Sequence, residues 1–362
     1  MKIQRIETLN QGSNVTVVRV TTAAGAEGYG QVAPFNADIT ATVLHRQIAP
    51  HVLGADAADL DAISDRCIDR NHKFPWSYVC RALAGVDTAL WDIRGKREGK
   101  SVCELLGGTP RPFPVYGSSM RRDITPQDEA DRLARLRDSK GFRAFKIRAG
   151  DVCSHDVDKW PGRTEALIPT VRKAIGNEPA LLIDGNSCYT PKRAIEVGRI
   201  LEDNNGGHFE EPCPYWELEW TAEVAAALDV PVAGGEQDVD LAQWQRMIAM
   251  PAVDIVQPDI CYVGGLTRAL RVADMAHKAG MPCVSHSANL SMVTVFSLHM
   301  MGAIPNAGPH VEFTIEPSGW TEGLYTPALE VHDGNVAIPD GPGWGVTLNP
   351  KWLEKAERQV SE

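Results

Sequence analysis

Hydrophobic and polar positions in the first third of the chain predict a small unit that mixes strands with helices. Residues 2–9 and 15–20 alternate in the manner of paired antiparallel strands, and the polar residues 10–14 between them predict a short turn. Over residues 79–93 apolar side chains recur every three or four positions, which predicts a helix. The breaker sequence at 109–112 ends this α+β unit.

From residue 115 onward, short apolar segments alternate regularly with helical stretches. Helical periodicity covers residues 127–139, 191–203 and 265–279. Eight strands joined by helical crossovers over about 200 residues predict a parallel (β/α) barrel. A doubly wound sheet is the alternative, but that fold does not require eight evenly spaced units. No GxGxxG motif follows the first strand, so the sequence does not support a dinucleotide site. The expected strands cover residues 115–118, 143–148, 180–184, 207–210, 230–234, 253–257, 282–285 and 309–313.

Two domains follow from this pattern. The barrel is expected to span residues 113–319. It is also expected to contain the catalytic residues, because active sites in such barrels lie at the carboxyl ends of the strands. Residues 1–112 form the second unit. The Gly-, Pro- and Trp-rich tail, about 320–362, is expected to fold back on that unit and complete a cap.

Composition narrows the class of protein. A chain of 362 residues with 43% hydrophobic and 23% charged residues has the composition of a folded globular protein. Its net charge of −11 argues against a nucleic-acid partner, since phosphates need a basic surface. No apolar run approaches the roughly 18 residues that cross a membrane, and the start MKIQRIETLN lacks an apolar signal core, so a cytoplasmic location without a membrane partner is expected. The eight cysteines form no CxxC, which favours reduced and mostly buried thiols over a zinc site.

Three acids stand where three successive expected strands end. Asp184, Glu210 and Glu236 each follow an apolar run, and 26 residues separate each from the next, about the length of one βα unit. Their carboxylates would therefore face one space, where uncompensated charges repel strongly. A hard cation, which prefers oxygen ligands, would offset this repulsion. The absence of Cys or His from the set favours Mg²⁺ over Zn²⁺. The alternative is three unrelated helix N-caps.

A second group of titratable residues follows the same spacing. Asp259 and His286 are 27 residues apart and would lie at adjacent strand ends, where a carboxylate can orient the imidazole of a general base or acid. Glu312 ends the last strand and would donate or accept a hydrogen bond to an enolate if its pKa is raised. On the second strand, Lys146 and Arg148 share one face and suit an anionic substrate, unless they form a solvated strand edge.

These residues together resemble the enolase superfamily, mandelate racemase subgroup. The resemblance covers nearly the whole chain, and the cap contributes to it through the sequence AGVDTALWD at 84–92 and LLGG at 105–108. The barrel contributes Asp184-Gly-Asn186, Glu210-Glu-Pro, Gly-Gly-Glu236, Pro-Asp259, Ser-His286 and Glu312, in that order.

The resemblance implies both a fold and the roles of the site residues. The fold is an α/β, (β/α)7β-type modified TIM barrel with an α+β capping domain. One Mg²⁺ would be bound by Asp184, Glu210 and Glu236. His286 and Asp259 would form the catalytic dyad, with Glu312 stabilising the enolate opposite the metal. Asn186 and Ser118 would contact the substrate or its carboxylate, and a homo-oligomer is expected.

One departure from the subgroup bears on the reaction. The subgroup often has Lys-x-Lys on the second strand with its second lysine as a base, and this chain has Arg148 there. Arginine stays protonated and cannot take a proton. His286 would then act from a single face, removing the α-proton of a sugar acid and assisting loss of the β-hydroxyl as water, which gives a 2-keto-3-deoxy acid. The implied enzyme is an acid-sugar hydro-lyase.

Other outcomes stay open at this point. A racemase or epimerase would use Lys146 and His286 as its two bases. A Mg²⁺-dependent cycloisomerase would share the proton abstraction. A non-catalytic relative would keep the metal or ligand site alone, although it would need neither the dyad nor Glu312.

Overall fold

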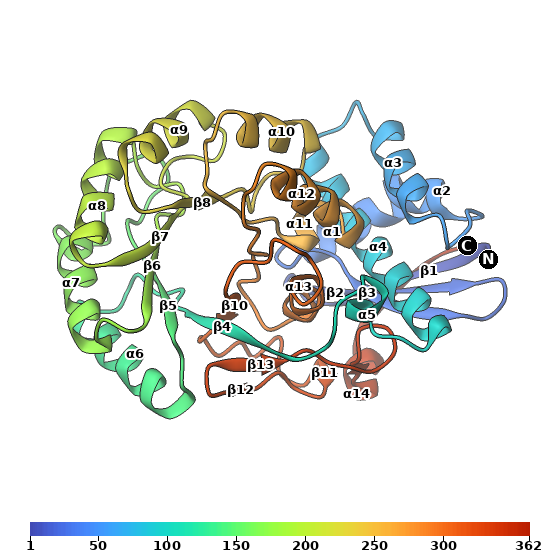
Figure 1. The fold of residues 1–362 in the computed structure, drawn as a ribbon. Coiled ribbons are helices and arrows are strands. Elements are labelled where there is room, and N and C mark those ends of the chain that lie inside the picture. The colour runs from blue at the N-terminus through green and yellow to red at the C-terminus, as the bar shows by residue number, and fades with distance from the viewer.

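The barrel strands follow one another in chain order in the computed structural model, which describes residues 1–362, and from β4 (Pro112–Ser118) to β9 (Ile255–Val256) each pairs in parallel with the next (Figure 1). The last strand pairs with the first and closes the ring. Between Val256 and the last strand, residues 282–285 contribute only isolated bridges through Cys283, so the expected strand there is reduced to single contacts. The strands are β4 (Pro112–Ser118), β5 (Ala144–Arg148), β6 (Ala180–Asp184), β7 (Gly206–Glu210), β8 (Val232–Gly234), β9 (Ile255–Val256) and β10 (Val311–Thr314).

Helices cover the outside of this ring (Figure 1). The helix over residues 191–203 shows why they do so: it begins with a proline at its first turn, and its buried residues Ala194, Val197, Gly198 and Leu201 recur every three or four positions. The barrel helices are α6 (Pro126–Lys140), α7 (Arg163–Ile175), α8 (Pro191–Asp203), α9 (Leu218–Ala227), α10 (Leu241–Ala249), α11 (Ile260–Val263), α12 (Leu266–Lys278) and α13 (Met292–Met301). The predicted barrel with a capping unit is confirmed.

The cap contains an antiparallel sheet with a long helix against it. The sheet order is β15 (Glu357–Ser361), β1 (Ile3–Gln11), β2 (Val15–Thr22) and β3 (Glu27–Gln31), so the end of the chain pairs with its beginning. The helix α4 (Trp76–Glu98) packs on β3 so closely that Gly30 lies against the backbone of Gly85. The other cap helices are α1 (Ala37–Val43), the π-helix η1 (Leu44–Ile48), α2 (Ala49–Val52), α3 (Leu60–Arg70) and α5 (Val102–Leu105).

The tail contacts the barrel as well as the cap. A hairpin of β12 (Val331–His332) and β13 (Asn335–Ala337) pairs with the start of β4. The remaining elements are β11 (Tyr325–Thr326), β14 (Thr347–Leu348) and α14 (Pro350–Glu354). The expectation placed the tail on the cap alone, and the domain limits at 112 and 319 stay predictions.

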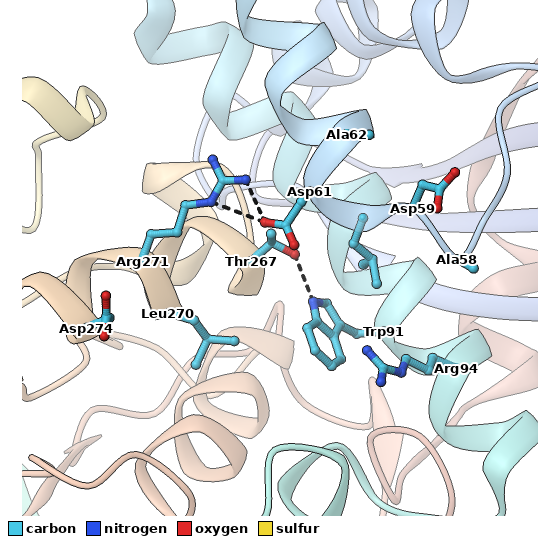
Figure 2. Close-up of a pocket in the computed structure, with 11 residues that line it drawn as sticks. Ala58, Asp59, Asp61, Ala62, Trp91, Arg94, Thr267, Leu270, Arg271 and Asp274 are labelled. Atoms are coloured by element: carbon cyan, nitrogen blue, oxygen red, sulfur yellow. Dashed lines mark hydrogen bonds and ion pairs between the residues drawn. The ribbon is translucent and has the colours of Figure 1, made fainter.

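A buried acid joins the cap to the barrel. Asp87 on α4 accepts a hydrogen bond from the backbone N–H of Thr267, in the first turn of α12. The indole N–H of Trp91 donates to the hydroxyl of the same threonine at 3.0 Å. A pocket of about 560 Å³ opens beside this contact, lined by α3, α4 and α12, with Arg271 paired to Asp61 at its rim (Figure 2).

Two further expectations concern the whole chain. All eight cysteines are free, as expected for reduced thiols, and all but Cys153 are buried. None of the helices combines the length and the apolar character that a membrane crossing requires.

Candidate active site at the carboxyl ends of the barrel strands

The three acids expected at strand ends lie there together. Asp184 and Glu210 end β6 and β7 and are register partners, while Glu236 follows β8 by two residues. None of the three residues is more than 6% exposed. The barrel register therefore brings three carboxylates to one edge, as the regular spacing predicted.

Each of these carboxylates has a cationic partner in the structure. Asp184 pairs with Arg148, and Glu210 pairs with Lys146. Glu236 Oε2 lies 3.0 Å from Nε2 of His286. With the side chains in these pairs, no group of three His, Cys, Asp or Glu converges on one point as a ready ligand set.

The donor chemistry nevertheless fits Mg²⁺. All candidate ligands are carboxylate oxygens at the ends of adjacent strands, and carboxylate oxygen is the donor type that this ion prefers. A fourth carboxylate, Glu211, lies beside them with its Oε1 buried and without a hydrogen-bond partner. Burial and the charges of Glu236, Asp184 and Glu210 hold the pKa of Glu211 well above its usual value. A buried carboxyl whose pKa is raised by three neighbouring carboxylates suits a divalent cation, because the cation would offset their mutual repulsion.

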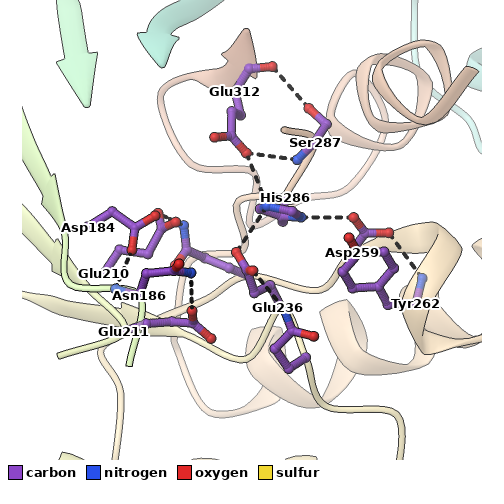
Figure 3. A network of polar contacts seen from close by, with 12 residues as sticks. Asp184, Asn186, Glu210, Glu211, Glu236, Asp259, Tyr262, His286, Ser287 and Glu312 are labelled. Carbon is purple, nitrogen blue, oxygen red and sulfur yellow. Dashed lines mark hydrogen bonds and ion pairs between the residues drawn. The ribbon is translucent and has the colours of Figure 1, made fainter. Parts of the chain in front are cut away.

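The dyad is assembled as expected. Asp259 Oδ2 lies 2.8 Å from Nδ1 of His286, and the two residues form a parallel bridge between neighbouring barrel segments. The other oxygen of Asp259 accepts the backbone N–H groups of Cys261 and Tyr262 and so caps α11. The imidazole therefore presents Nε2 to the carboxylates (Figure 3).

The charge around His286 favours its protonated form in this structure. Burial lowers the pKa of His286, but the carboxylates of Glu236 and Glu312 and the hydrogen bond to Asp259 together raise it well above its ordinary value. Nε2 lies 3.7 Å from Oε2 of Glu312. His286 can act as a base only in its neutral form, so its basic role depends on whether the charge of Glu236 is neutralised by another group.

The pKa of Glu312 is lowered, whereas its hydrogen bond to an enolate was expected on the condition that this pKa is raised. Burial raises the pKa of its carboxyl, but Lys146, His286 and hydrogen bonds from Ser118 and the backbone of Ser287 outweigh burial and lower that pKa below the ordinary range. The Lys146 ammonium lies 2.9 Å from Oε1, and the Ser118 hydroxyl donates to the same oxygen at 2.7 Å. The buried cation beside Glu312 therefore favours its ionised form, and its role toward an enolate stays a prediction.

Lys146 is enclosed within the barrel. Its side chain is 0% exposed and its ammonium pairs with Glu312, Glu210 and, at 3.6 Å, Asp184. The ring of Tyr116 lies below it, with the centroid 5.5 Å from Nζ. Lys146 and Arg148 therefore face the interior, and the alternative of a solvated strand edge is wrong.

The backbone is strained where Asn186 enters the site. Asn186, Ser187 and Glu211 all have positive φ, at 48°, 64° and 41°, although none is glycine. The amide of Asn186 donates to Oε2 of Glu211 at 3.3 Å, which orients it beside the carboxylates. All ten residues singled out from the sequence thus lie in one region of the barrel mouth.

Several residues of this region escaped the sequence analysis. Gln257 donates to Oε2 of Glu210 at 2.7 Å, and its position directly after β9 and two residues before Asp259 was an available signal. Glu211 was visible only as a neighbour of Glu210. Gln237 donates to Oε1 of Glu236 at 2.9 Å, and no spacing rule pointed to it.

The comparisons with known proteins define the family. The profile described as "Mandelate racemase / muconate lactonizing enzyme, N-terminal domain" matches residues 4–107, and that described as "Enolase C-terminal domain-like" matches residues 128–352. The chain therefore belongs to the mandelate racemase/muconate lactonizing enzyme family of the enolase superfamily, and it is an enzyme of that superfamily.

Solved structures similar to this chain extend over its whole length. A putative racemase from Roseobacter denitrificans is 57% identical, with a TM-score of 0.98 and 100% of both chains covered. A mandelate racemase/muconate lactonizing protein from Paracoccus denitrificans PD1222, complexed with magnesium, is 30% identical, with a TM-score of 0.89 and 99% of each chain covered. An L-talarate dehydratase from Polaromonas sp. JS666, complexed with Mg and L-glucarate, is 26% identical, with a TM-score of 0.85 and 99% of each chain covered.

Curated relatives point in the same direction. An L-talarate/galactarate dehydratase of Salmonella typhimurium is 30% identical over 92% of this chain and 80% of its own length. A D-galactarolactone cycloisomerase of Agrobacterium fabrum is 35% identical over 74% of this chain and 71% of its own length. Dehydratases of this kind are hydro-lyases, and magnesium is present in structural neighbours.

Proposed function

We propose that this enzyme dehydrates a sugar acid to a 2-keto-3-deoxy acid. The observation that carries the proposal is the His286–Asp259 dyad, which faces a buried carboxylate cluster while Arg148 occupies the place of a second base. His286 takes the proton from the carbon next to the substrate carboxylate. The electron pair forms a C=C bond as the β-hydroxyl leaves, and the enol product becomes the ketone.

Asp184, Glu210 and Glu236 would hold the magnesium ion. Bound Mg²⁺ supplies positive charge that stabilises the anion formed when the α-proton leaves. Asp259 keeps the imidazole in the tautomer that presents Nε2, and the protonated His286 can return its proton to the departing hydroxyl. Asn186, Arg148 and Ser118 are proposed to contact the substrate.

Lys146 supports a reaction on one face. Its ammonium is buried among three carboxylates, so the proposed role is electrostatic stabilisation of an anionic substrate. The guanidinium of Arg148 stays charged and cannot remove a proton. The dehydratase names among the relatives support the same reaction class.

A racemase or epimerase is the second candidate. It is favoured by the 57% identity to a protein described as a putative racemase and by Lys146, which lies across Glu312 from His286. In that reaction Lys146 would deliver a proton to the opposite face of the same anion, and no water would leave.

The test uses the purified chain with Mg²⁺ and a library of aldonic and aldaric acids in D₂O. Semicarbazide detects a 2-keto-3-deoxy product, and NMR detects exchange of the α-proton. A keto product with a subset of the stereoisomers is the expected result, and His286→Asn is the control for contaminating activity. Exchange without loss of water would replace the proposal with racemisation, whereas neither exchange nor water loss with any acid would point to a binding protein.

A further inference from the structure

A cation of the cap reaches the dyad side of the barrel mouth. Arg81 lies in the second turn of α4, and the segment after β3 donates a backbone hydrogen bond to its carbonyl oxygen from Ala33. Its guanidinium carbon lies 3.6 Å from the ring centroid of Tyr262 on α11. This distance is short for a cation–π contact, which extends to about 6 Å.

Tyr262 connects this contact to the catalytic pair. The backbone N–H of Tyr262 donates to Asp259 at 3.0 Å, and its ring centroid is 6.0 Å from that of His286. The ring of Tyr262 is thus a neighbour of both the Arg81 guanidinium and the His286 imidazole. Both members of the dyad are touched by a residue on which Arg81 packs.

A second chain of contacts leads to the proposed metal ligand. Arg81 Nη2 donates to Oε1 of Gln237 at 3.3 Å, and the amide nitrogen of Gln237 donates to Oε1 of Glu236 at 2.9 Å. The hydrogen bond from Arg81 fixes which end of the Gln237 amide faces Glu236. A flipped amide would present an oxygen to a carboxylate, which repels it.

We propose that Arg81 is a positioning residue through which the cap orients His286 and Glu236 without touching the substrate. The two contact chains end on the two side chains that meet at 3.0 Å, so one guanidinium controls both sides of this junction. The catalytic consequence rests on the proposed function, whereas the effect on the geometry of the dyad does not.

The structure supplies a matched control on the same helix. Arg94 also lies on α4 and places its guanidinium over an aromatic ring, that of Trp91, at 5.3 Å. Trp91 and Arg94 line the pocket of Figure 2, which contains none of the site residues. Replacing Arg81 therefore removes a cation–π contact that is linked to the dyad, and replacing Arg94 removes one that is not.

The experiment compares Arg81→Met, Arg81→Lys and Arg94→Met in the full chain. Methionine keeps much of the apolar stem and removes the charge and the donors. For Arg81→Met we expect kcat on the dehydrated sugar acid to fall about 10- to 100-fold with KM changed much less, as for other residues that orient a metal ligand. Arg81→Lys should recover part of the loss, and Arg94→Met should behave as the wild type.

A readout that needs no substrate accompanies these rates. The proton between His286 and Asp259 can be followed by NMR in the metal-free protein, where His286→Asn identifies its resonance. Arg81→Met should shift or broaden this resonance at an unchanged melting temperature, and Arg94→Met should not. An unchanged resonance in folded Arg81→Met would overturn the proposal, even if no sugar acid proved to be a substrate. A shifted resonance without any turnover would retain the positioning role and contradict only the proposed function.

Discussion

His286 and Glu236 meet at 3.0 Å, so the proposed base and a proposed metal ligand share one hydrogen bond in this structure. The negative charge of Glu236 is the first influence that raises the pKa of His286 against the effect of burial. A cation bound by Glu236 would compete with the imidazolium for the charge of this carboxylate. The charge state of the base and the occupancy of the metal site are therefore linked.

Glu236→Gln should weaken Mg²⁺ binding strongly. Replacing the carboxylate removes one anionic donor of three, and we expect a loss of at least about 100-fold, since even residues that only orient a ligand contribute 10- to 100-fold. Isothermal titration with MgCl₂ measures this. Glu219→Gln, at an exposed acid on α9, is the control. A normal affinity in the first variant would remove Glu236 from the ligand set.

His286→Asn should abolish exchange of the α-proton and leave the metal site able to bind. Asparagine keeps a polar group near Asp259 but cannot take a proton, and loss of a general base costs about 10²- to 10⁴-fold. NMR in D₂O follows the exchange, and the same titration follows Mg²⁺. Retained exchange would transfer the role of the base to another residue, with Lys146 as the first to replace.

The sequence was sufficient to predict the residues that depend on strand periodicity. The 26-residue intervals placed Asp184, Glu210 and Glu236 at one edge because a barrel returns each strand end to the same rim. Helix α8 agrees with its expected range of 191–203, since a proline and an amphipathic pattern define it locally. Residues 282–285 have the apolar sequence of a strand but form only isolated bridges. Strand pairing depends on the adjacent segments of the fold as well as on the apolar content of the segment itself.

The remaining features depend on contacts between distant segments. Arg81 reaches Tyr262 only because α4 of the cap docks against α11 of the barrel. The lowered pKa of Glu312 depends on Lys146, which lies on a different strand. No periodicity of a single segment encodes either relation, since both are set by how the two domains and the strands meet.

Gly30→Ala should destabilise the cap. A Cβ at Gly30 would lie 2.3 Å from the carbonyl oxygen of Gly85 and 2.6 Å from the backbone nitrogen of Ala89, both on α4. Because these are backbone atoms, β3 and α4 would have to separate, at a cost of about 1–3 kcal/mol or more in the free energy of unfolding. Urea denaturation measures the loss. Gly319→Ala meets nothing within 4 Å and should be close to neutral, so equal stability of the two variants would contradict the packing argument.

Asp87 should make part of the stability dependent on pH. Burial raises the pKa of Asp87 to about 6, although hydrogen bonds from Thr267 and Leu266 oppose the shift. Because the folded-state pKa is the higher one, the proton stabilises the fold fully below about pH 4, and this contribution is lost as the pH rises through about 6. Asp87→Asn stays neutral throughout, so the stability of the wild type relative to this variant should fall by about 2 kcal/mol between about pH 4 and about pH 7.5.

The measurement is the free energy of unfolding in urea at about pH 4 and about pH 7.5, for the wild type and Asp87→Asn in parallel. The difference between the two proteins is the relevant quantity, because every other titrating group contributes equally to both. Asp203→Asn, an exposed acid at the end of α8, should follow the wild type at both pH values. Should Asp87→Asn also run parallel to the wild type, the carboxylate must be ionised in the folded protein, and its contact with the first turn of α12 would then be that of a charged helix cap.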